Sequence, residues 1–232
     1  MIEAVIFDFD GTLTELTLNF TDLRRAVEKI AEHYVGAAAV RQVESLSIIE
    51  MIYEVERMAG EGGPAFSEEA FIRLSDLEVE AASGKAVYPY TREVLRALRE
   101  KGVKIGIITR NCTAALAKVF PDMEAYADAV RTREHVHEVK PKPGHVEAVL
   151  RALDVAGSGA LLVGDHPTDI LAGEAAGAAT VGVLTGRTTR AEFERVGAGY
   201  IVDDIRGVVG LVDENSRQGR NSAPAGKGRI MR

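Results

Sequence analysis

The chain has 232 residues, of which 46% are hydrophobic, a formal net charge of -7 at pH 7 and a single cysteine. This length and hydrophobic content suffice for one larger domain or for a core domain with an insert. The acidic balance argues against general nucleic-acid binding, which depends on clustered Lys and Arg. One cysteine excludes an intrachain disulfide, and no apolar stretch has the length of a membrane span, so we expect a cytoplasmic protein without membrane contact.

An apolar run at residues 4–7 predicts a buried strand near the start of the chain. The acidic turn Asp8-Phe9-Asp10-Gly11-Thr12 follows it directly. Isolated carboxylates in a low-dielectric interior are costly unless a metal ion or hydrogen-bond donors compensate them, so the turn predicts a functional site. The alternative is an ordinary strand-to-turn junction, in which the two aspartates only bond turn amides.

Residues 15–86 change to helical periodicity and predict an inserted helical cap. A first helix has Leu23, Val27 and Ile30 on one face, and a second helix is expected over residues 45–59. The segment 60–64 is expected to break the chain, with Ser67 capping a third helix. Three amphipathic helices of this kind form a small lid.

Residues 87–212 alternate short β-branched runs with helices, which is typical of a doubly wound parallel α/β sheet. Together with residues 1–14 they form the predicted core domain. Thr91 is expected to cap the first helix of this region. Residues 213–232 are rich in Ser, Gly, Asn and basic side chains, and we predict a disordered tail there. The further strands are expected at residues 103–108, 129–131, 160–163, 179–183 and 200–202.

Polar residues end three of the predicted strands. Asp8 and Asp10 end the first strand, Thr109 ends the second, and Asp165 ends the fourth, with Lys140 in the loop region before it. In an open parallel sheet, the carboxyl ends of the strands line the crevice where ligands bind. These groups converge if the first strand lies between the second and the fourth.

Four short motifs now become specific as a set: DFDGTLT at residues 8–14, IIT ending in Thr109, VKPKP around Lys140, and GDHPTD at residues 164–169. In this order they resemble the motifs of the haloacid dehalogenase (HAD) superfamily, whose core is a Rossmann-like α/β sheet. The resemblance covers residues 1–212 and rests on several independent positions. A helical cap between the first two motifs is similar to that of the phosphoglycolate phosphatase and β-phosphoglucomutase branch.

The resemblance implies different roles for the acids. Asp8 is the implied nucleophile, which forms an aspartyl-phosphate and divides one difficult displacement into two easier ones. Asp10 is the implied general acid and base, and its backbone carbonyl is an implied metal ligand. Asp165 and Asp169 join Asp8 in the implied Mg²⁺ site, because oxygen ligands suit this cation. Asp169 has helix capping as an alternative role, since acids favour the first helical turn.

Phosphate recognition is implied for a further set of groups. Thr109 is expected to donate its hydroxyl to phosphate, and Lys140 to neutralise the nucleophile and the transferring phosphoryl group. Lys142 competes for that role, but the family pattern places its lysine before the first proline, which selects Lys140. His166 departs from the family pattern, and it either touches the phosphate or the leaving group or is a plain loop histidine. The other implied phosphate-binding residues are Gly11, Thr12, Arg110 and Asn111.

We therefore expect a magnesium-dependent phosphatase that acts on a small phosphorylated metabolite, either phosphoglycolate-like or a sugar phosphate. A phosphomutase of the β-phosphoglucomutase type is the alternative enzyme, and Thr12 argues against it because those enzymes typically resemble DxDGV. A third hypothesis is a phosphate-binding regulatory protein whose cap and basic tail engage a partner. The complete set of catalytic residues argues against the third hypothesis.

Overall fold

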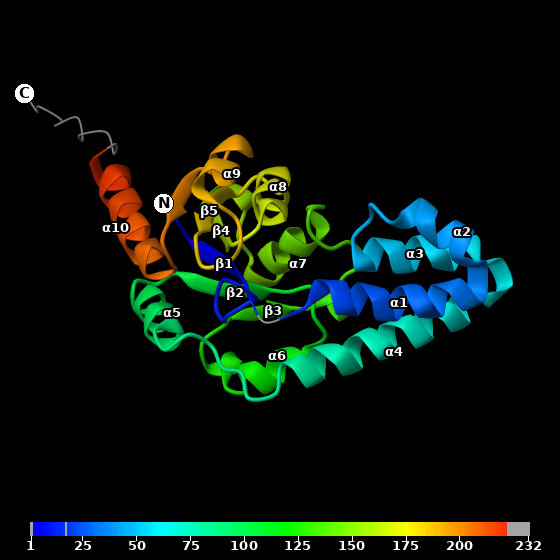
Figure 1. The fold of residues 1–232 in the computed structure, drawn as a ribbon. Coiled ribbons are helices and arrows are strands. Elements are labelled where there is room, and N and C mark those ends of the chain that lie inside the picture. Colours follow the sequence, from blue (N-terminus) through cyan, green and yellow to red (C-terminus); the bar gives the residue numbers. More distant parts are fainter. Residues whose placement is uncertain (1, 17, 222–232) are drawn as a thin grey trace, which may run out of the picture. The chain divides into compact units, whose positions relative to one another are not determined.

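The computed structural model describes residues 2–16 and 18–221, and the chain divides into two compact units. The first unit is built around a parallel β-sheet, whereas the described residues of the second contain helices and no strand (Figure 1). Within the described ranges, no helix combines the length and the apolar character that a bilayer crossing requires.

The first unit contains a six-stranded sheet with the strand order β3-β2-β1-β4-β5-β6. Every neighbouring pair is parallel, and β1 is buried along its whole length. Central parallel strands are covered on both faces, which explains why β1 is a continuous apolar run up to Asp8. The predicted doubly wound parallel sheet is confirmed, with β1 between β2 and β4. The strands are β1 Ala4–Asp8, β2 Lys104–Ile108, β3 Ala129–Arg131, β4 Ala160–Gly164, β5 Ala179–Val183 and β6 Tyr200–Val202.

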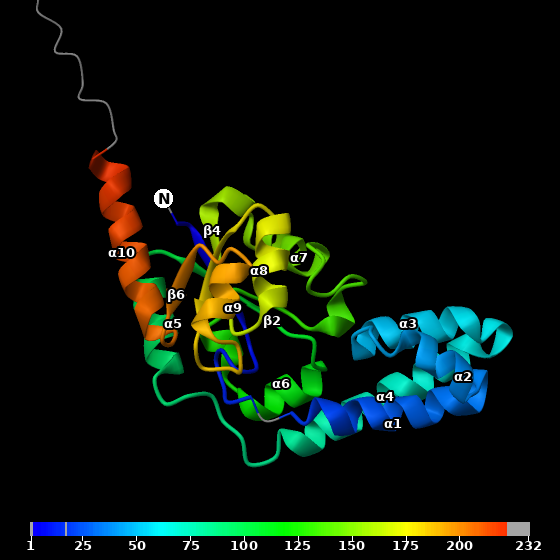
Figure 2. The ribbon, with the colours of Figure 1, turned by 45° about the horizontal axis from the view of Figure 1, so that its top comes forward.

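Helices cover the sheet, with α7 and α8 on one side and α5 and α10 on the other (Figure 2). Val146 and Val149 of α7 belong to the same buried cluster as Ile6 of β1. A side chain at Gly106 would place its Cβ 2.4 Å from Val149, so glycine allows α7 to approach β2 closely. The helices of this unit are α5 Thr91–Glu100, α7 Gly144–Leu153, α8 Pro167–Ala175, α9 Arg190–Arg195 and α10 Arg206–Asn221.

Helix α10 continues past the predicted end of the core at residue 212. The prediction of a disordered tail is therefore wrong for residues 213–221, while residues 222–232 lie outside the described residues. Val208 and Val212 are buried on this helix, and Lys101 Nζ lies 2.7 Å from Asp213 Oδ1. Apolar burial and this ion pair hold α10 to the unit as far as Asp213, which composition alone does not reveal.

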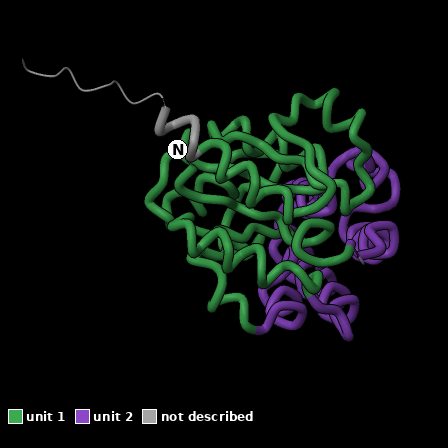
Figure 3. The backbone as a smooth tube through the Cα atoms, turned by 90° about the vertical axis from the view of Figure 1, so that its left-hand side faces the viewer, with its two compact units in different colours: residues 1–15, 87–110, 122–232 green, residues 16–86, 111–121 purple. Residues whose placement is uncertain are grey.

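The second unit comprises residues 16–86 and 111–121 (Figure 3). Its buried cluster includes Leu23 and Val27 of α1, Ile52 of α3, and Phe66 and Leu74 of α4. The short segment 111–121 contains α6 and groups with these helices, although it lies inside the predicted core range 87–212. The helices are α1 Phe20–Val35, α2 Ala37–Val40, α3 Ile48–Met58, α4 Gly63–Ala81 and α6 Thr113–Val119. Short 3-10 helices in the two units cover Arg41–Val43, Gly60–Gly62, Met123–Ala125, Arg133–His135 and Gly157–Gly159.

The start of α4 differs from the prediction. The helix begins at Gly63 with Pro64 in its first turn, so Ser67 lies inside the helix and does not cap it. Proline is tolerated in a first turn because the N–H that it lacks has no intrahelical partner there. A Cβ at Gly63 would lie 2.2 Å from the Glu56 carbonyl oxygen, so this glycine permits the close packing of α4 against α3.

Candidate active site

The turn after β1 is tightly closed by its own backbone. The N–H groups of Thr12, Leu13 and Thr14 all donate to the Phe9 carbonyl, over 3.2, 2.8 and 3.2 Å. Gly11 has a φ of +79°, and its N–H donates to the Thr14 carbonyl over 2.9 Å. A left-handed φ of this kind favours glycine, which has no Cβ. The amides of Gly11 and Thr12 thus donate within the turn, and the implied phosphate contacts of these two residues stay a prediction.

Two segments far away in the sequence fix this turn. Thr91 Oγ1 donates to the Leu13 carbonyl over 2.8 Å. Thr91 is therefore the first residue of α5 and a tether for the turn, and the prediction that it caps the helix is wrong. From the loop after β5, Thr185 Oγ1 donates to the Gly11 carbonyl over 2.5 Å. Sequence reasoning does not find Thr185, because it belongs to no recognisable motif.

Three buried carboxylates lie together at the carboxyl ends of β1 and β4. One oxygen each of Asp8, Asp165 and Asp169 lies within 4.8 Å of the others. The backbone approaches Asp165 so closely that a Cβ at Gly11 would lie 2.2 Å from Asp165 Oδ2, and one at Gly186 only 1.9 Å away. The two glycines therefore form a narrow cradle for Asp165, and Gly186 is a second residue that sequence reasoning misses.

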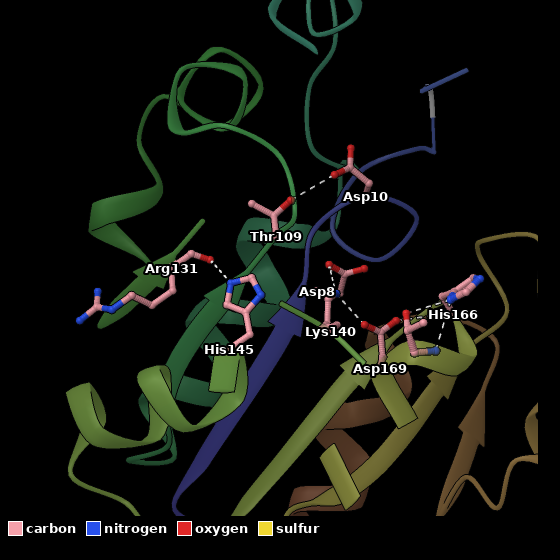
Figure 4. A network of polar contacts seen from close by, with 9 residues as sticks. Asp8, Asp10, Thr109, Arg131, Lys140, His145, His166 and Asp169 are labelled. Carbon is pink, nitrogen blue, oxygen red and sulfur yellow. Dashed lines mark hydrogen bonds and ion pairs between the residues drawn. The ribbon is translucent and has the colours of Figure 1, made fainter. Parts of the chain in front are cut away.

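Lys140 is the cation of this acidic cluster. Its Nζ lies 2.6 Å from Asp8 Oδ1 and 2.6 Å from Asp169 Oδ1, and its side chain is only 3% exposed (Figure 4). Lys142 instead lies 3.4 Å from Glu138 at a largely exposed position. Of the two lysines in the VKPKP motif, the structure thus brings Lys140 to the acids.

The electrostatics of the cluster are dominated by burial. Burial, followed by the charges of Asp8 and Asp169, raises the pKa of Asp165 to about 8. Burial also raises the pKa of Asp169 to about 6, against the opposing effect of Lys140. For Lys140, burial alone would lower the pKa, but the charges of Asp169 and Asp8 raise it. Once all three carboxylates have lost their protons, they and the Lys140 ammonium together carry a formal charge of -2, which favours binding of a divalent cation.

Asp169 and His166 together cap α8. Asp169 Oδ2 accepts a hydrogen bond from the His166 backbone N–H over 3.0 Å, while its Oδ1 contacts Lys140. His166 Nδ1 accepts from the Thr168 backbone N–H over 3.2 Å and lies 2.9 Å from Thr168 Oγ1. Asp169 therefore does cap the helix, as the alternative holds, and it also belongs to the acidic cluster. For His166, the structure shows contacts that fix the start of α8.

Thr109 and Asp10 form a separate pair beside the cluster. Thr109 is buried, and its Oγ1 donates to Asp10 Oδ2 over 3.4 Å (Figure 4). Within the described part of the chain, the Asp10 side chain is not a member of the group of three acids that could hold a metal. The expected metal contact of Asp10 involves its backbone carbonyl and stays a prediction.

The loop after β2 is held by a buried arginine. Arg133 Nη1 donates to the Arg110 carbonyl over 2.9 Å, and Arg133 is 6% exposed. The Thr109 backbone N–H donates to the Arg131 carbonyl over 3.1 Å. Asn111, which follows Arg110 in the sequence, belongs to the second unit. Arg133 is a third site-supporting residue outside the motifs, and its Arg-Glu-His context gives no signal for this role.

His145 is a fourth residue that the motifs do not include. It lies in the first turn of α7, fully buried, with Nε2 2.9 Å from the Arg131 carbonyl oxygen. Burial, followed by the charge of Lys140, lowers the pKa of His145 to about 4. The imidazole is therefore neutral at physiological pH.

Comparison with known proteins gives consistent results. The family model for haloacid dehalogenase-like hydrolases matches residues 2–177. A phosphoglycolate phosphatase of Rhodospirillum rubrum is 29% identical over 230 residues, covering 88% of this chain and 88% of that protein. A phosphoglycolate phosphatase of Pseudomonas putida is 26% identical over 249 residues, covering 97% and 89%. A solved β-phosphoglucomutase of Clostridium difficile aligns with a TM-score of 0.65 and 19% identity over 95% of this chain and 100% of that one, which shows a shared fold.

Proposed function

The chain belongs to the haloacid dehalogenase-like hydrolase family, and from this premise we propose that it is a magnesium-dependent phosphatase. Its substrate is a small phosphate monoester, either phosphoglycolate-like or a sugar phosphate, and the reaction proceeds through an aspartyl-phosphate on Asp8. The observation that carries this proposal is the buried group of Asp8, Asp165 and Asp169, of which Asp8 and Asp169 contact the ammonium of Lys140. Such a group does not stabilise an apolar core, because each buried charge requires compensation.

The acidic cluster fits Mg²⁺ by charge and by ligand type. With its three carboxylates deprotonated, its formal charge of -2 matches a divalent cation, and carboxylate oxygens are the ligands that this hard cation prefers. Asp8, Asp165 and Asp169 would hold the ion, with the Asp10 carbonyl as a proposed further ligand. When bound, the ion neutralises charge on the phosphate and so lets an anionic nucleophile approach phosphorus.

Asp8 contacts the Lys140 ammonium, whereas Asp10 accepts a hydrogen bond from Thr109, and these environments suit a nucleophile and a general acid and base, respectively. An Asp8 carboxylate oxygen forms a bond to phosphorus while the ester P–O bond breaks, and Asp10 gives its proton to the leaving oxygen. In the second step, Asp10 takes a proton from a water molecule that attacks phosphorus, which releases inorganic phosphate and restores Asp8. Lys140 holds Asp8 and faces the developing negative charge, and Thr109, Arg110 and Asn111 are the proposed contacts of the phosphoryl oxygens.

The phosphoglycolate phosphatases that align over most of the chain support the class of substrate. The likeness to a β-phosphoglucomutase concerns the fold alone, because its identity is 19%. This likeness therefore does not support transfer of the phosphoryl group back to a sugar over transfer to water.

The proposed function is tested with purified protein and a panel of phosphoglycolate, hexose phosphates, nucleoside monophosphates and pyrophosphate, each with Mg²⁺ and with EDTA. We expect release of inorganic phosphate only with Mg²⁺, and its loss in Asp8→Asn. Asp203→Asn is the matched control, because the Asp203 side chain is 91% exposed. Full turnover by Asp8→Asn, or no phosphate from any ester, contradicts the proposal. Isomerisation of β-glucose 1-phosphate without release of phosphate identifies a mutase instead.

A further inference from the structure

His145 is a buried titratable side chain that the chemistry above does not use. It is 0% exposed, and its ring lies between the Arg131 carbonyl and the pair formed by Asp8 and Lys140 (Figure 4). The ring nitrogen that is not bonded to Arg131 faces that pair (Figure 4). The role of His145 therefore depends on the hydrogen bonds that its two ring nitrogens make.

The contact with Arg131 determines where the imidazole carries its proton. A carbonyl oxygen only accepts hydrogen bonds, so the 2.9 Å contact requires a proton on Nε2. Because the low pKa keeps the imidazole neutral, Nδ1 has no proton and is an acceptor. The same Arg131 carbonyl accepts a hydrogen bond from the backbone N–H of Thr109. The Nε2–H group of His145 is therefore bonded to the same backbone carbonyl that positions Thr109.

The acceptor side of His145 is unsatisfied within the protein. Nδ1 is buried and has no hydrogen-bond partner among the described residues. An ammonium has three N–H donors, and Lys140 directs two of them to Asp8 and Asp169. Its third N–H has no acceptor in the described part of the chain. Among the described residues, the Nδ1 acceptor of His145 thus lacks a donor, and the third N–H of Lys140 lacks an acceptor. Buried polar groups without a hydrogen-bond partner are costly.

A single water molecule between them would satisfy both groups. No direct hydrogen bond joins Lys140 and His145, and a contact that is longer than a hydrogen bond is commonly bridged by water. A water that accepts from the ammonium can donate to the imidazole, and buried waters typically bond otherwise unsatisfied polar groups in this way. The polarity matches, because the unprotonated nitrogen faces the cation.

We propose that His145 is a positioning residue for Lys140, whose ammonium it orients through one buried water molecule that donates to Nδ1. The bridge keeps the ammonium directed at Asp8 and Asp169 while the Nε2–H bond holds the ring to Arg131. The effect on turnover rests on the proposed phosphatase function, whereas the tautomer and the hydrogen bond at Nδ1 do not depend on it.

Nitrogen NMR of the unsubstituted protein tests the hydrogen bond directly. In spectra recorded at about pH 7, we expect a neutral imidazole with its proton on Nε2, and an Nδ1 resonance displaced toward the position of a nitrogen that accepts a hydrogen bond. The signal is assigned by its loss in His145→Asn. A proton on Nδ1, a charged ring, or an Nδ1 resonance typical of a free lone pair overturns the proposal even if the protein is an active phosphatase.

A pair of variants separates the two nitrogens in activity. His145→Asn places an oxygen acceptor near the position of Nδ1 and loses the donor to Arg131, whereas His145→Gln keeps a donor near Nε2 and loses the acceptor. We expect kcat of His145→Gln to fall about tenfold with an unchanged KM, and that of His145→Asn to stay within about threefold of the unsubstituted protein.

A purely structural role predicts a different pattern, because each variant loses one buried hydrogen bond and the two should then be equally impaired. Equal kcat values, or a lower value for His145→Asn, contradict the proposal. Thermal unfolding of both variants shows whether they fold, and the NMR experiment decides the question if either does not. Failure of the phosphatase assay with the unsubstituted protein overturns the proposed function and leaves the NMR result standing.

Discussion

Replacement of Asp165 separates two effects of the acidic cluster, namely the stability that its buried charges cost and the stabilisation that it gains by binding Mg²⁺. Without a metal ion, burial and the charges of Asp8 and Asp169 raise the pKa of Asp165 from 3.8 to about 8. The folded protein therefore binds this proton more tightly than the unfolded chain does. The corresponding stability is fully present below the unfolded pKa and is lost as pH rises toward 8.

The magnitude follows from the interval between the unfolded pKa and the working pH. At pH 7 this interval is about three pH units, and each unit corresponds to about 1.4 kcal/mol. Asp165 therefore makes the free energy of unfolding at pH 7 about 4 kcal/mol lower than it is below the unfolded pKa. We expect Asp165→Asn, which has a similar shape without the charge, to raise the free energy of unfolding of the metal-free protein by up to this amount. The same variant should lose the stabilisation by Mg²⁺, which for a functional site is about 2.7 kcal/mol at a hundred times Kd.

The assay is urea unfolding followed by circular dichroism between about pH 5.5 and 8, with EDTA and with Mg²⁺. In EDTA, the unsubstituted protein should lose stability as pH rises, and Asp165→Asn should do so less steeply. Asp203→Asn, at a 91% exposed side chain, controls for the change in net charge. The reasoning is refuted if Asp165→Asn destabilises the metal-free protein at pH 7, or if Mg²⁺ stabilises this variant as much as the unsubstituted protein.

Three further changes probe the site and its turn. Lys140→Met should lower kcat by about a hundredfold or more, because it removes the ammonium that contacts Asp8 and Asp169. Lys142→Met should stay within about twofold in a steady-state phosphatase assay. Equal losses would contradict this assignment. Gly11→Ala should lower the free energy of unfolding in urea by about 2 kcal/mol or more, since φ is +79° and the new methyl group would lie 2.2 Å from Asp165; an unchanged midpoint would refute the cradle. Thr91→Val should cost about 1 kcal/mol in the same assay by removing the hydroxyl donor to the turn, and Thr91→Ser should restore most of it.

The part of the site that sequence predicts is the part that parallel strands bring together. Asp8 ends β1 and Asp165 follows β4, and these two strands are neighbours, so their acids meet regardless of the details of the loops. Lys140 was recognisable because its motif accompanies the two acidic motifs. The alternating pattern of residues 87–212 also predicts the doubly wound sheet, because buried strands and amphipathic helices have different periodicities.

The remaining features depend on contacts between segments that carry no pattern of their own. Thr185 reaches the Gly11 carbonyl across the sheet from β5, and Gly186 is required only because Asp165 lies against it. His145 reads as an ordinary helix residue until the position of the Arg131 carbonyl is known. Likewise, Gly63 and Pro64 signal a break in sequence, yet they start α4, because its first turn can accept proline and α3 packs closely there.

The central claim is that Asp8 becomes phosphorylated during turnover, and the most direct measurement is to trap that intermediate. The enzyme is mixed with Mg²⁺ and a hydrolysed substrate, quenched in acid within one turnover, reduced with borohydride, and mapped by mass spectrometry. Borohydride reduces an acyl phosphate to an alcohol, so we expect the reduced residue at position 8 alone, and none in Asp8→Asn. Rapid release of phosphate without modification of Asp8, or modification of a different residue, contradicts the account.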